Sequence, residues 1–291
     1  MTARLWPRYI PSRQLLTLRM EGSTNRITPR SFLFACGALA ALFFSVRTTA
    51  HKQRAAQAPD GVVSVAAPSW QRGAYWATVD HQLLIDFGNL ARFHGADLNV
   101  GPPAAGENRV VFMGDSITEG WHLDKSFPGK PYINRGISGQ TSSQMLLRFR
   151  QDVVDLKPKV VLVLAGTNDF AENTGPVTLE QVEGNIMSMA QLGTANGIRV
   201  VLCSVLPSVH FPWHPELPDP AARIAALNKW MKAYVVEKDY IYVDYYSAMK
   251  NPAGGLSRGL SPDGVHPSAA GYAIMAPLAQ SAIERALKGK G

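Results

Sequence analysis

The sequence contains little cysteine and no long apolar run, and both absences narrow its class. Its 291 residues include two cysteines, Cys36 and Cys203, which excludes a disulfide framework and a four-cysteine zinc site. The longest uncharged apolar run falls short of the about 20 residues that a membrane-spanning helix needs. With 46% hydrophobic and 18% charged residues, the composition is typical of a globular protein and excludes collagen-like and coiled-coil chains.

Most of the chain also lacks net charge. Residues 1–60 hold nine of the 29 basic residues but two of the 22 acidic ones, so this segment accounts for the whole net charge of +7. Residues 61–291 are therefore neutral overall. Because a nucleic-acid-binding domain needs a basic face on its folded part, we expect no nucleic-acid partner.

The N-terminal segment resembles an export signal. Residues 32–46 (FLFACGALAALFFSV) are apolar, Arg26 and Arg30 precede them, and small residues follow. This order is typical of a secretory signal. We expect an exported protein, periplasmic or secreted, whose segment 32–46 is either a cleaved signal or a retained membrane anchor. A buried helix of the folded domain is the alternative, and a start at Met20 instead of Met1 would give a signal of more usual length.

Composition divides the chain into three parts. Residues 1–55 form the predicted leader and linker, and residues 56–105 an N-terminal extension with one amphipathic helix at 80–94. The turn-rich residues 101–108 then lead into a domain that we place at 106–291.

Within residues 106–291, short β-branched runs alternate with longer helical patterns. Strands are predicted at 110–113, 160–165, 200–205 and 241–243, with a weaker one at 132–134, and helices at 142–154, 179–196, 220–237 and 268–288. Nearly continuous apolar strands are buried on both faces, so the alternation predicts a parallel sheet covered by helices on both sides. Such sheets bind ligands beyond the carboxyl ends of their strands.

Four short segments are placed to meet at that edge. Residues 114–117 (GDSI) put Ser116 at a strand-to-helix turn, where its amide lies near a helix N-terminus. Residues 134–141 supply glycines, residues 166–169 (GTND) supply an amide, and residues 263–267 (DGVHP) supply an Asp and a His three apart. Taken alone, each has an ordinary structural explanation: an N-cap, a glycine turn, Asn-Asp turn chemistry or a solvated pair.

An Asp and a His at this spacing can hydrogen-bond to each other. The Asp263 carboxylate would then hold the tautomer of His266 and stabilise its charged form. The imidazole would be free to take a proton from Ser116.

In order and spacing, the four segments together resemble the SGNH hydrolases, also called GDSL-type esterases. The resemblance covers about residues 106–288, with Ile117 where the name-giving motif has leucine. It implies an α/β fold, a three-layer α/β/α sandwich with a five-stranded parallel sheet of the flavodoxin-like type. It also implies chemistry without a metal or cofactor.

The resemblance further implies a role for each matched residue. Ser116 would be the nucleophile, His266 the general base and Asp263 its orienting partner. The oxyanion hole would consist of the backbone amides of Ser116 and Gly139 together with the side-chain amide of Asn168.

Four further residues are candidates for contacting the substrate. Asp115 stands beside the predicted nucleophile, and Trp121, Phe170 and Trp213 could shape an acyl or leaving-group pocket. The alternative for these aromatic residues is that they cover the core.

We therefore expect a serine ester hydrolase whose substrate is a small-molecule or glycan ester of a small acyl group such as acetyl. The alternatives are a lysophospholipase- or thioesterase-type acyl hydrolase and a non-catalytic carbohydrate-binding module of the cell envelope. Ser257 in residues 255–259 (GLSRG) also fits a hydrolase motif, but not between a strand and a helix, so we expect a glycine-rich loop there.

Overall fold

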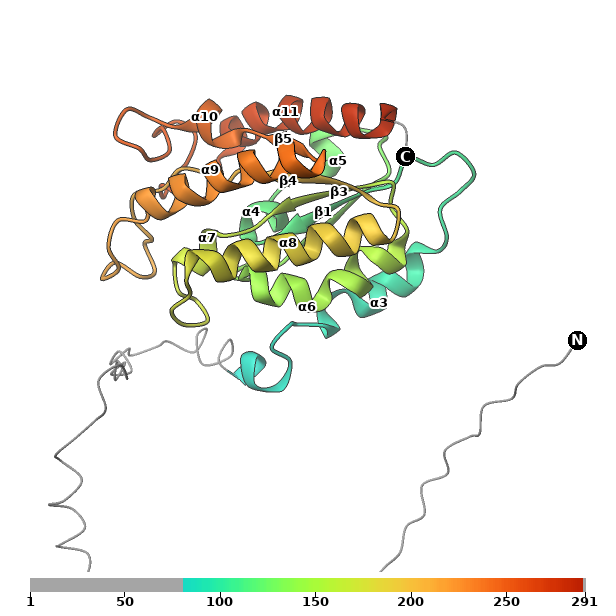
Figure 1. Cartoon of the computed structure of the whole chain (residues 1–291), viewed down its shortest axis with the longest axis horizontal. Coiled ribbons are helices and arrows are strands. Elements are labelled where there is room, and N and C mark those ends of the chain that lie inside the picture. Colours follow the sequence, from blue (N-terminus) through green and yellow to red (C-terminus); the bar gives the residue numbers. More distant parts are fainter. Residues whose placement is uncertain (1–80, 290–291) are drawn as a thin grey trace, which may run out of the picture. The chain divides into compact units, whose positions relative to one another are not determined.

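A five-stranded parallel sheet lies between two layers of helices in the computed structural model, which describes residues 81–289 (Figure 1). The strands are β1 Val110–Gly114, β2 Tyr132–Gly136, β3 Val160–Leu164, β4 Arg199–Cys203 and β5 Ile241–Val243. Their order is β2-β1-β3-β4-β5, and every neighbouring pair is parallel. The predicted fold class is confirmed.

The strand order brings the candidate segments to one edge of the sheet. In the registers of β1 with its two neighbours, Gly114 lies opposite both Gly136 and Leu164. The chain leaves all three strands at the same level, at the point where the strand order reverses. In parallel sheets this crevice is where ligands bind.

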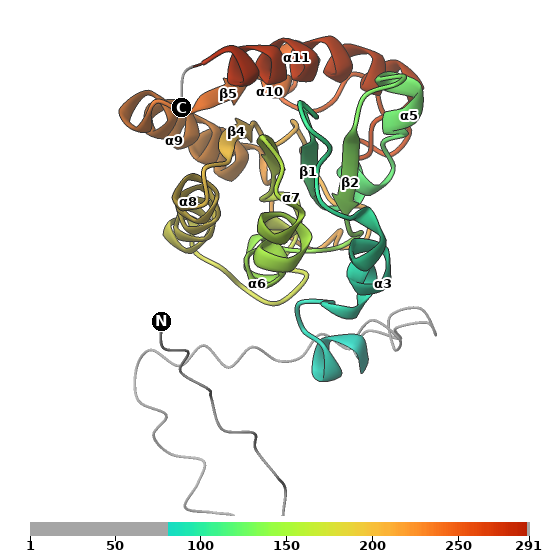
Figure 2. The same cartoon turned by 90° about the vertical axis from the view of Figure 1, so that its right-hand side faces the viewer.

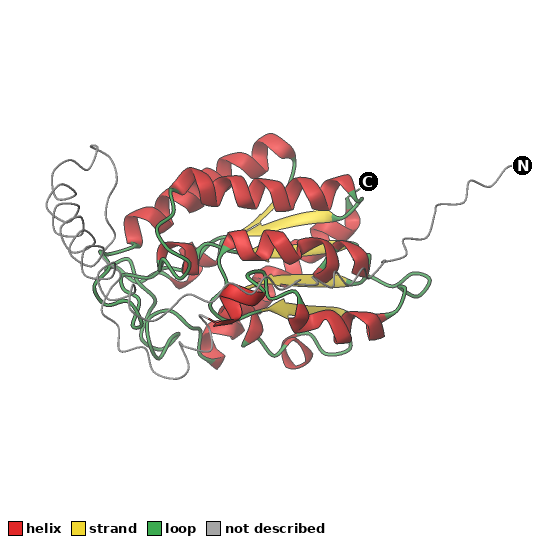
Figure 3. Cartoon of the chain, turned by 90° about the horizontal axis from the view of Figure 1, so that it is seen from below, coloured by secondary structure: helices red, strands yellow, loops and turns green. Residues whose placement is uncertain are grey.

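Alternation along the strands divides the core into two halves. Val111 and Met113 of β1 face one cluster, whereas Val110 and Phe112 face the other. The first face is covered by α6 (Ser142–Asp152), α8 (Leu179–Ala195) and α9 (Ala221–Lys238), and the second by α11 (Ala269–Lys288) with the short α5 (Leu123–Ser126) and α10 (Tyr245–Met249). Figures 2 and 3 show the helices on both sides of the sheet.

The long helices begin and end close to their predicted bounds because local signals fix them. Thr178 caps α8 with a capping box completed by Gln181, as the sequence indicates. The same helix stops before Gly197, whose φ of 73° suits a residue without Cβ. The remaining helices are α3 (Ala91–Val100), α4 (Ser116–Glu119), α7 (Thr167–Phe170) and the 3-10 helix η1 (Val154–Leu156).

The single helix predicted at 80–94 is wrong. Residues 81–85 are helical, the chain then turns, and α3 begins at Ala91. Asp86 causes part of the break, because its carboxylate accepts a hydrogen bond from the Ala91 amide at 3.0 Å. Asn89 contributes a left-handed φ of 53°. Leu84 is 86% exposed, so the apolar pattern does not mark a buried face.

The predicted leader at 1–55 and its apolar segment 32–46 lie outside the described residues. Between residues 81 and 289, none of the helices is long and apolar enough to cross a membrane.

Candidate active site

Ser116, His266 and Asp263 form one hydrogen-bonded row. Ser116 Oγ lies 2.9 Å from His266 Nε2, and His266 Nδ1 lies 2.7 Å from Asp263 Oδ2. The serine begins α4 directly after β1, whereas the other two residues come from the loop before α11. His266 and Asp263 each keep about a third of their side chain exposed, so the row is open to a substrate.

The loop around Asp263 holds this carboxylate in its charged form. Asp263 Oδ1 accepts hydrogen bonds from the amides of Val265 and His266, at 3.0 and 2.8 Å, and from Ser261 Oγ at 3.1 Å. Burial raises the pKa of Asp263, but the hydrogen bonds from His266 and Val265 outweigh it and lower the pKa to about 2. Asp263 is therefore suited to hold a cationic imidazole.

Two backbone amides at the site have no acceptor of their own. Within residues 81–289, neither the Ser116 amide nor the Gly139 amide donates a hydrogen bond. The Ser116 amide is in the first turn of α4, where amides have no partner inside the helix. Both groups are thus free to bind a negatively charged oxygen.

The glycine loop is brought against α4 by a close approach of backbones. A Cβ on Gly136 would lie 2.1 Å from the Glu119 amide nitrogen, so β2 can end there only with glycine. Glu119 then accepts a hydrogen bond from the Ser138 amide at 2.8 Å. Gly139 follows with a φ of 77°. These contacts fix the loop beside Ser116.

Asn168 lies buried between the two segments that carry the free amides. Its Nδ2 donates to the Gln140 carbonyl at 3.1 Å and to Asp115 Oδ2 at 3.3 Å. Its Oδ1 accepts a hydrogen bond from Asn173 Nδ2 at 3.0 Å. The side-chain amide predicted for the oxyanion hole therefore faces the neighbours of Ser116 and Gly139.

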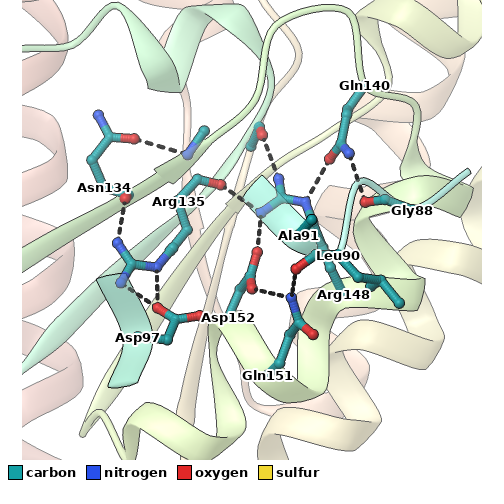
Figure 4. Close-up of polar contacts among 12 residues, drawn as sticks. Gly88, Leu90, Ala91, Asp97, Asn134, Arg135, Gln140, Arg148, Gln151 and Asp152 are labelled. Carbon is teal, nitrogen blue, oxygen red and sulfur yellow. Dashed lines mark hydrogen bonds and ion pairs between the residues drawn. The ribbon is translucent and has the colours of Figure 1, made fainter. Parts of the chain in front are cut away.

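A buried arginine, Arg148, forms hydrogen bonds with the ends of β1 and β2 and with the glycine loop (Figure 4). Arg148 of α6 is fully buried and donates hydrogen bonds to the carbonyls of Gly114 and Arg135, to Gln140 Oε1 and to Asp152 Oδ2. One cation thus joins the ends of β1 and β2 to the glycine loop.

The structure brings Ser116, Asp263, His266, Gly139 and Asn168 together, while their catalytic roles stay predictions. Three of the four predicted substrate contacts need correction, because their side chains are buried. Asp115 is the N-cap of α4 and accepts a hydrogen bond from the Ile117 amide at 3.0 Å, and burial raises its pKa to about 7.

Trp121 and Phe170 belong to the core, which was the alternative interpretation for the aromatic residues. Trp121 is 3% exposed, and its ring packs against Phe112, Phe127, Tyr245 and Tyr272. Phe170 is 2% exposed, with the Arg223 guanidinium over its ring. Neither side chain is available to a substrate in this structure.

Trp213 does lie at the site, since its ring centroid is 5.9 Å from that of His266. Its Nε1, however, donates a hydrogen bond to Asn173 Oδ1 at 3.0 Å. The sequence-based reasoning missed Asn173 and Arg148. A polar residue in a turn and a basic residue in an amphipathic helix carry no local signal that distinguishes them from solvent-exposed neighbours.

Residues that could hold a metal do not gather here. The described part of the chain contains no group of three His, Cys, Asp or Glu side chains placed to hold a metal ion.

Comparisons with known proteins identify the same family that the four segments resemble. The sequence profile of the GDSL-like lipase/acylhydrolase family matches residues 112–274. The chain is 46% identical in sequence to the crystal structure of a GDSL-like lipase from Bacteroides thetaiotaomicron, with a TM-score of 0.67 over 69% of this chain and 100% of that one.

Two curated bacterial proteins are more distant relatives. The esterase TesA of Pseudomonas aeruginosa is 28% identical over 181 residues, which cover 57% of this chain and 83% of TesA. The lipoprotein YqeF of Bacillus subtilis is 29% identical over 131 residues, 38% of this chain and 54% of YqeF. The chain therefore spans about half the length of YqeF.

Proposed function

Because this chain belongs to the GDSL-like lipase/acylhydrolase family, we propose that it is a serine ester hydrolase that forms an acyl-enzyme on Ser116. The observation that carries the proposal is the row from Ser116 Oγ through His266 to Asp263, with separations of 2.9 and 2.7 Å. A nucleophile, a base and an orienting group in hydrogen-bond contact are what acyl transfer by serine requires.

The first half-reaction follows from the protonation states. With its Nδ1 proton directed at Asp263, His266 presents an unprotonated Nε2 to the Ser116 hydroxyl. This nitrogen takes the hydroxyl proton as Oγ bonds to the ester carbonyl carbon, and the carbonyl oxygen becomes an oxyanion. The imidazolium then gives its proton to the departing alkoxide, which leaves as an alcohol and leaves the acyl group on Ser116.

The second half-reaction uses the same groups on water. His266 takes a proton from a water molecule, whose oxygen attacks the acyl carbon and forms a second oxyanion. The free amides of Ser116 and Gly139 and the carboxamide of Asn168 are the donors for both oxyanions. Collapse releases the carboxylic acid and returns the proton to Ser116.

A short acyl group, acetyl among them, is the substrate that this site favours. The Trp213 ring stands beside the imidazole and is tied through Asn173 to the loop of Gly139, and we take this fixed ring to border the acyl group. Longer acyl chains, as in lysophospholipids or acyl thioesters, would need that space. Acetyl groups on a glycan would suit a protein exported to the cell envelope.

Export remains part of the proposal. The apolar segment 32–46 with its preceding arginines supports it, and the relative YqeF is a lipoprotein. Fractionation of the producing cells, with mass determination of the mature N-terminus, would separate a cleaved signal from a retained anchor. A cytoplasmic protein with an intact N-terminus would contradict export.

Hydrolysis of p-nitrophenyl acetate by the purified protein tests the activity. Ser116→Ala should lower kcat by at least about 10³-fold, because the nucleophile is lost while the fold remains. Ser257→Ala is the matched control and should act like the wild type. A fluorophosphonate probe should label Ser116, as peptide mapping would show.

The chain-length preference needs a second measurement. Within the p-nitrophenyl ester series, kcat/KM should be highest for acetate and fall for butyrate and octanoate. A preference for octanoate would favour a lysophospholipase-type enzyme. No turnover of any ester and no label on Ser116 would favour a non-catalytic module.

A further inference from the structure

We propose that Trp213 and Asn173 are positioning residues that set which way the oxyanion donor of Asn168 points. The inference rests on the proposed function and assigns to the same site two residues that do not react with the ester. It is carried by a continuous row of hydrogen bonds from the Trp213 indole through Asn173 to Asn168.

The row has a direction because its first member can only donate. An indole N–H has no lone pair to offer, so the atom that Trp213 Nε1 meets at 3.0 Å must be the oxygen of the Asn173 carboxamide. Nδ2 of Asn173 then points the other way, where it donates to the Gly139 carbonyl at 2.9 Å and to Asn168 Oδ1 at 3.0 Å.

A carbonyl oxygen can only accept, so Gly139 imposes the same orientation independently. Turning the Asn173 carboxamide over would place its NH₂ against the indole N–H and its oxygen against the Gly139 carbonyl. Both contacts would be repulsive, and each would leave a partly buried polar group without a partner. Asn173 is therefore fixed from two sides.

The orientation passes from Asn173 to Asn168. Because Asn173 donates an N–H, Asn168 accepts it with Oδ1. The Nδ2 of Asn168 is then directed toward Asp115 and Gln140. Those residues directly adjoin Ser116 and Gly139, whose free amides are the other two donors. The same Asn173 side chain thus holds the peptide of Gly139 and the carboxamide of Asn168 in one arrangement.

Preorganised donors stabilise an oxyanion without a cost of reorientation at the moment of reaction. The 3.3 Å contact of Asn168 with Asp115 is the longer of its two donor contacts, and it is the one that we expect the oxyanion to replace. Asn173 and Trp213 thus act on kcat through Asn168 and Gly139 rather than by binding the ester.

Two substitutions at Asn173 separate this role from a merely structural one. Asn173→Asp keeps the size and the acceptor for Trp213 but sets an oxygen against the Gly139 carbonyl and Asn168 Oδ1. The Asn168 carboxamide must then either turn over, against the Gln140 carbonyl that now fixes its Nδ2, or move away, and both responses misplace the donor. Asn173→Leu removes both polar atoms but places no acceptor against Asn168, so Nδ2 of Asn168 should stay on the Gln140 carbonyl. A positioning role therefore predicts a loss of kcat that is larger for Asn173→Asp and does not follow the melting temperature, whereas a structural role predicts losses of activity that follow the melting temperature in both variants.

The measurement is kcat and KM for p-nitrophenyl acetate at the plateau of the pH profile, together with the melting temperature. Asn173→Asp should approach the about 10²-fold loss of kcat expected for one missing oxyanion donor, with KM little changed. Trp213→Phe keeps a ring beside His266 and should lose about 3- to 10-fold, the size of one ordinary hydrogen bond. Thr174→Val, on the same loop but outside the hydrogen bonds that join Trp213, Asn173 and Asn168, is the control and should match the wild type.

A double substitution tests whether Asn173 acts through Asn168. In an Asn168→Ala background, Asn173→Asp should cost much less than it does alone, because the donor that it misdirects is gone. An undiminished cost there, or a wild-type kcat for both Asn173→Asp and Trp213→Phe, would overturn the inference. Equal rates for the wild type and Ser116→Ala would instead contradict the proposed function itself.

Discussion

At the scale of single residues, the site combines a carboxylate of lowered pKa, Asp263, with hydrogen-bond donors whose positions are fixed by their neighbours. Asp263 is kept ionised by hydrogen bonds from its own loop. Asn168 contacts the neighbours of Ser116 and Gly139, Asp115 and Gln140, so its carboxamide lies beside the two segments that carry the free amides. Charge stabilisation in the transition state would therefore depend on oriented dipoles, which makes individual donors measurable.

Asn168→Ala should remove one of these donors. We expect kcat to fall by about 10²–10³, roughly 3–4 kcal/mol, with little change in KM, because the oxyanion exists mainly in the transition state. Measuring kcat and the melting temperature together distinguishes this role from that of a turn residue. A variant that melts early but turns over at the wild-type rate would leave Asn168 with a structural role alone.

The acid side of the pH–rate profile should contain no step from Asp263. Its pKa lies below the unfolded value of 3.8, at about 2, so any stability that its contacts contribute is present above pH 3.8 and is lost as the pH falls through about 2. Down to about pH 4, Asp263 should therefore add no protonation step of its own to log kcat/KM. Asp263→Asn should lower kcat by up to about 10⁴. A protonation step near pH 4 that the wild type shows and Asp263→Asn abolishes would contradict the low pKa of Asp263.

At the scale of elements, the sheet and its long helices could be predicted because their signals are local. The β-branched runs that became β1, β3 and β4 are continuous, and the capping box of Thr178 lies within four residues. The four candidate segments could be placed together since parallel strands bring their carboxyl ends to one edge.

What could not be predicted depends on partners distant in sequence. Nothing near Arg148 shows that α6 will bury it against the Gly114 carbonyl, 34 residues away. Trp121 follows the nucleophile motif closely, yet Phe112 and Tyr272 enclose its ring. The helix predicted at 80–94 was wrong for the opposite reason. A local side-chain hydrogen bond, from the Ala91 amide to Asp86, outweighed the helical pattern.

The role of α6 as a support for the site can be tested through Arg148. Arg148→Met should destabilise the protein by about 3–5 kcal/mol, because it leaves the buried Asp152 carboxylate without its cation. Arg150→Met, on an exposed position of the same helix, is the matched control and should change stability by less than about 0.5 kcal/mol. Urea unfolding of both variants gives the comparison, and equal midpoints would show that the buried ion pair is not needed.

At the scale of the whole molecule, residues of the N-terminal extension form hydrogen bonds with the segments that support the site. Three glutamine side chains hold backbone carbonyls of the N-terminal extension: Gln140 binds Gly88 at 3.0 Å, Gln144 binds Phe87 at 2.8 Å and Gln151 binds Leu90 at 2.7 Å. Asp97 of α3 pairs with Arg135 at the end of β2. Gln140, next to Gly139, is shared between the extension, Arg148 and the carboxamide of Asn168.

Shortening the chain from its N-terminus should therefore have two distinct outcomes. A chain of residues 56–291 lacks the predicted leader and should fold with full esterase activity. A chain of residues 106–291 begins beyond α3 and loses the hydrogen bonds to Gln140, Gln144 and Gln151, each worth about 0.5–1.5 kcal/mol. It should melt earlier, and kcat should fall because Gln140 and the adjoining Gly139 lose a support. Melting curves and p-nitrophenyl acetate turnover of the two chains test this, and equal behaviour would show that α3 and the turn before it are dispensable.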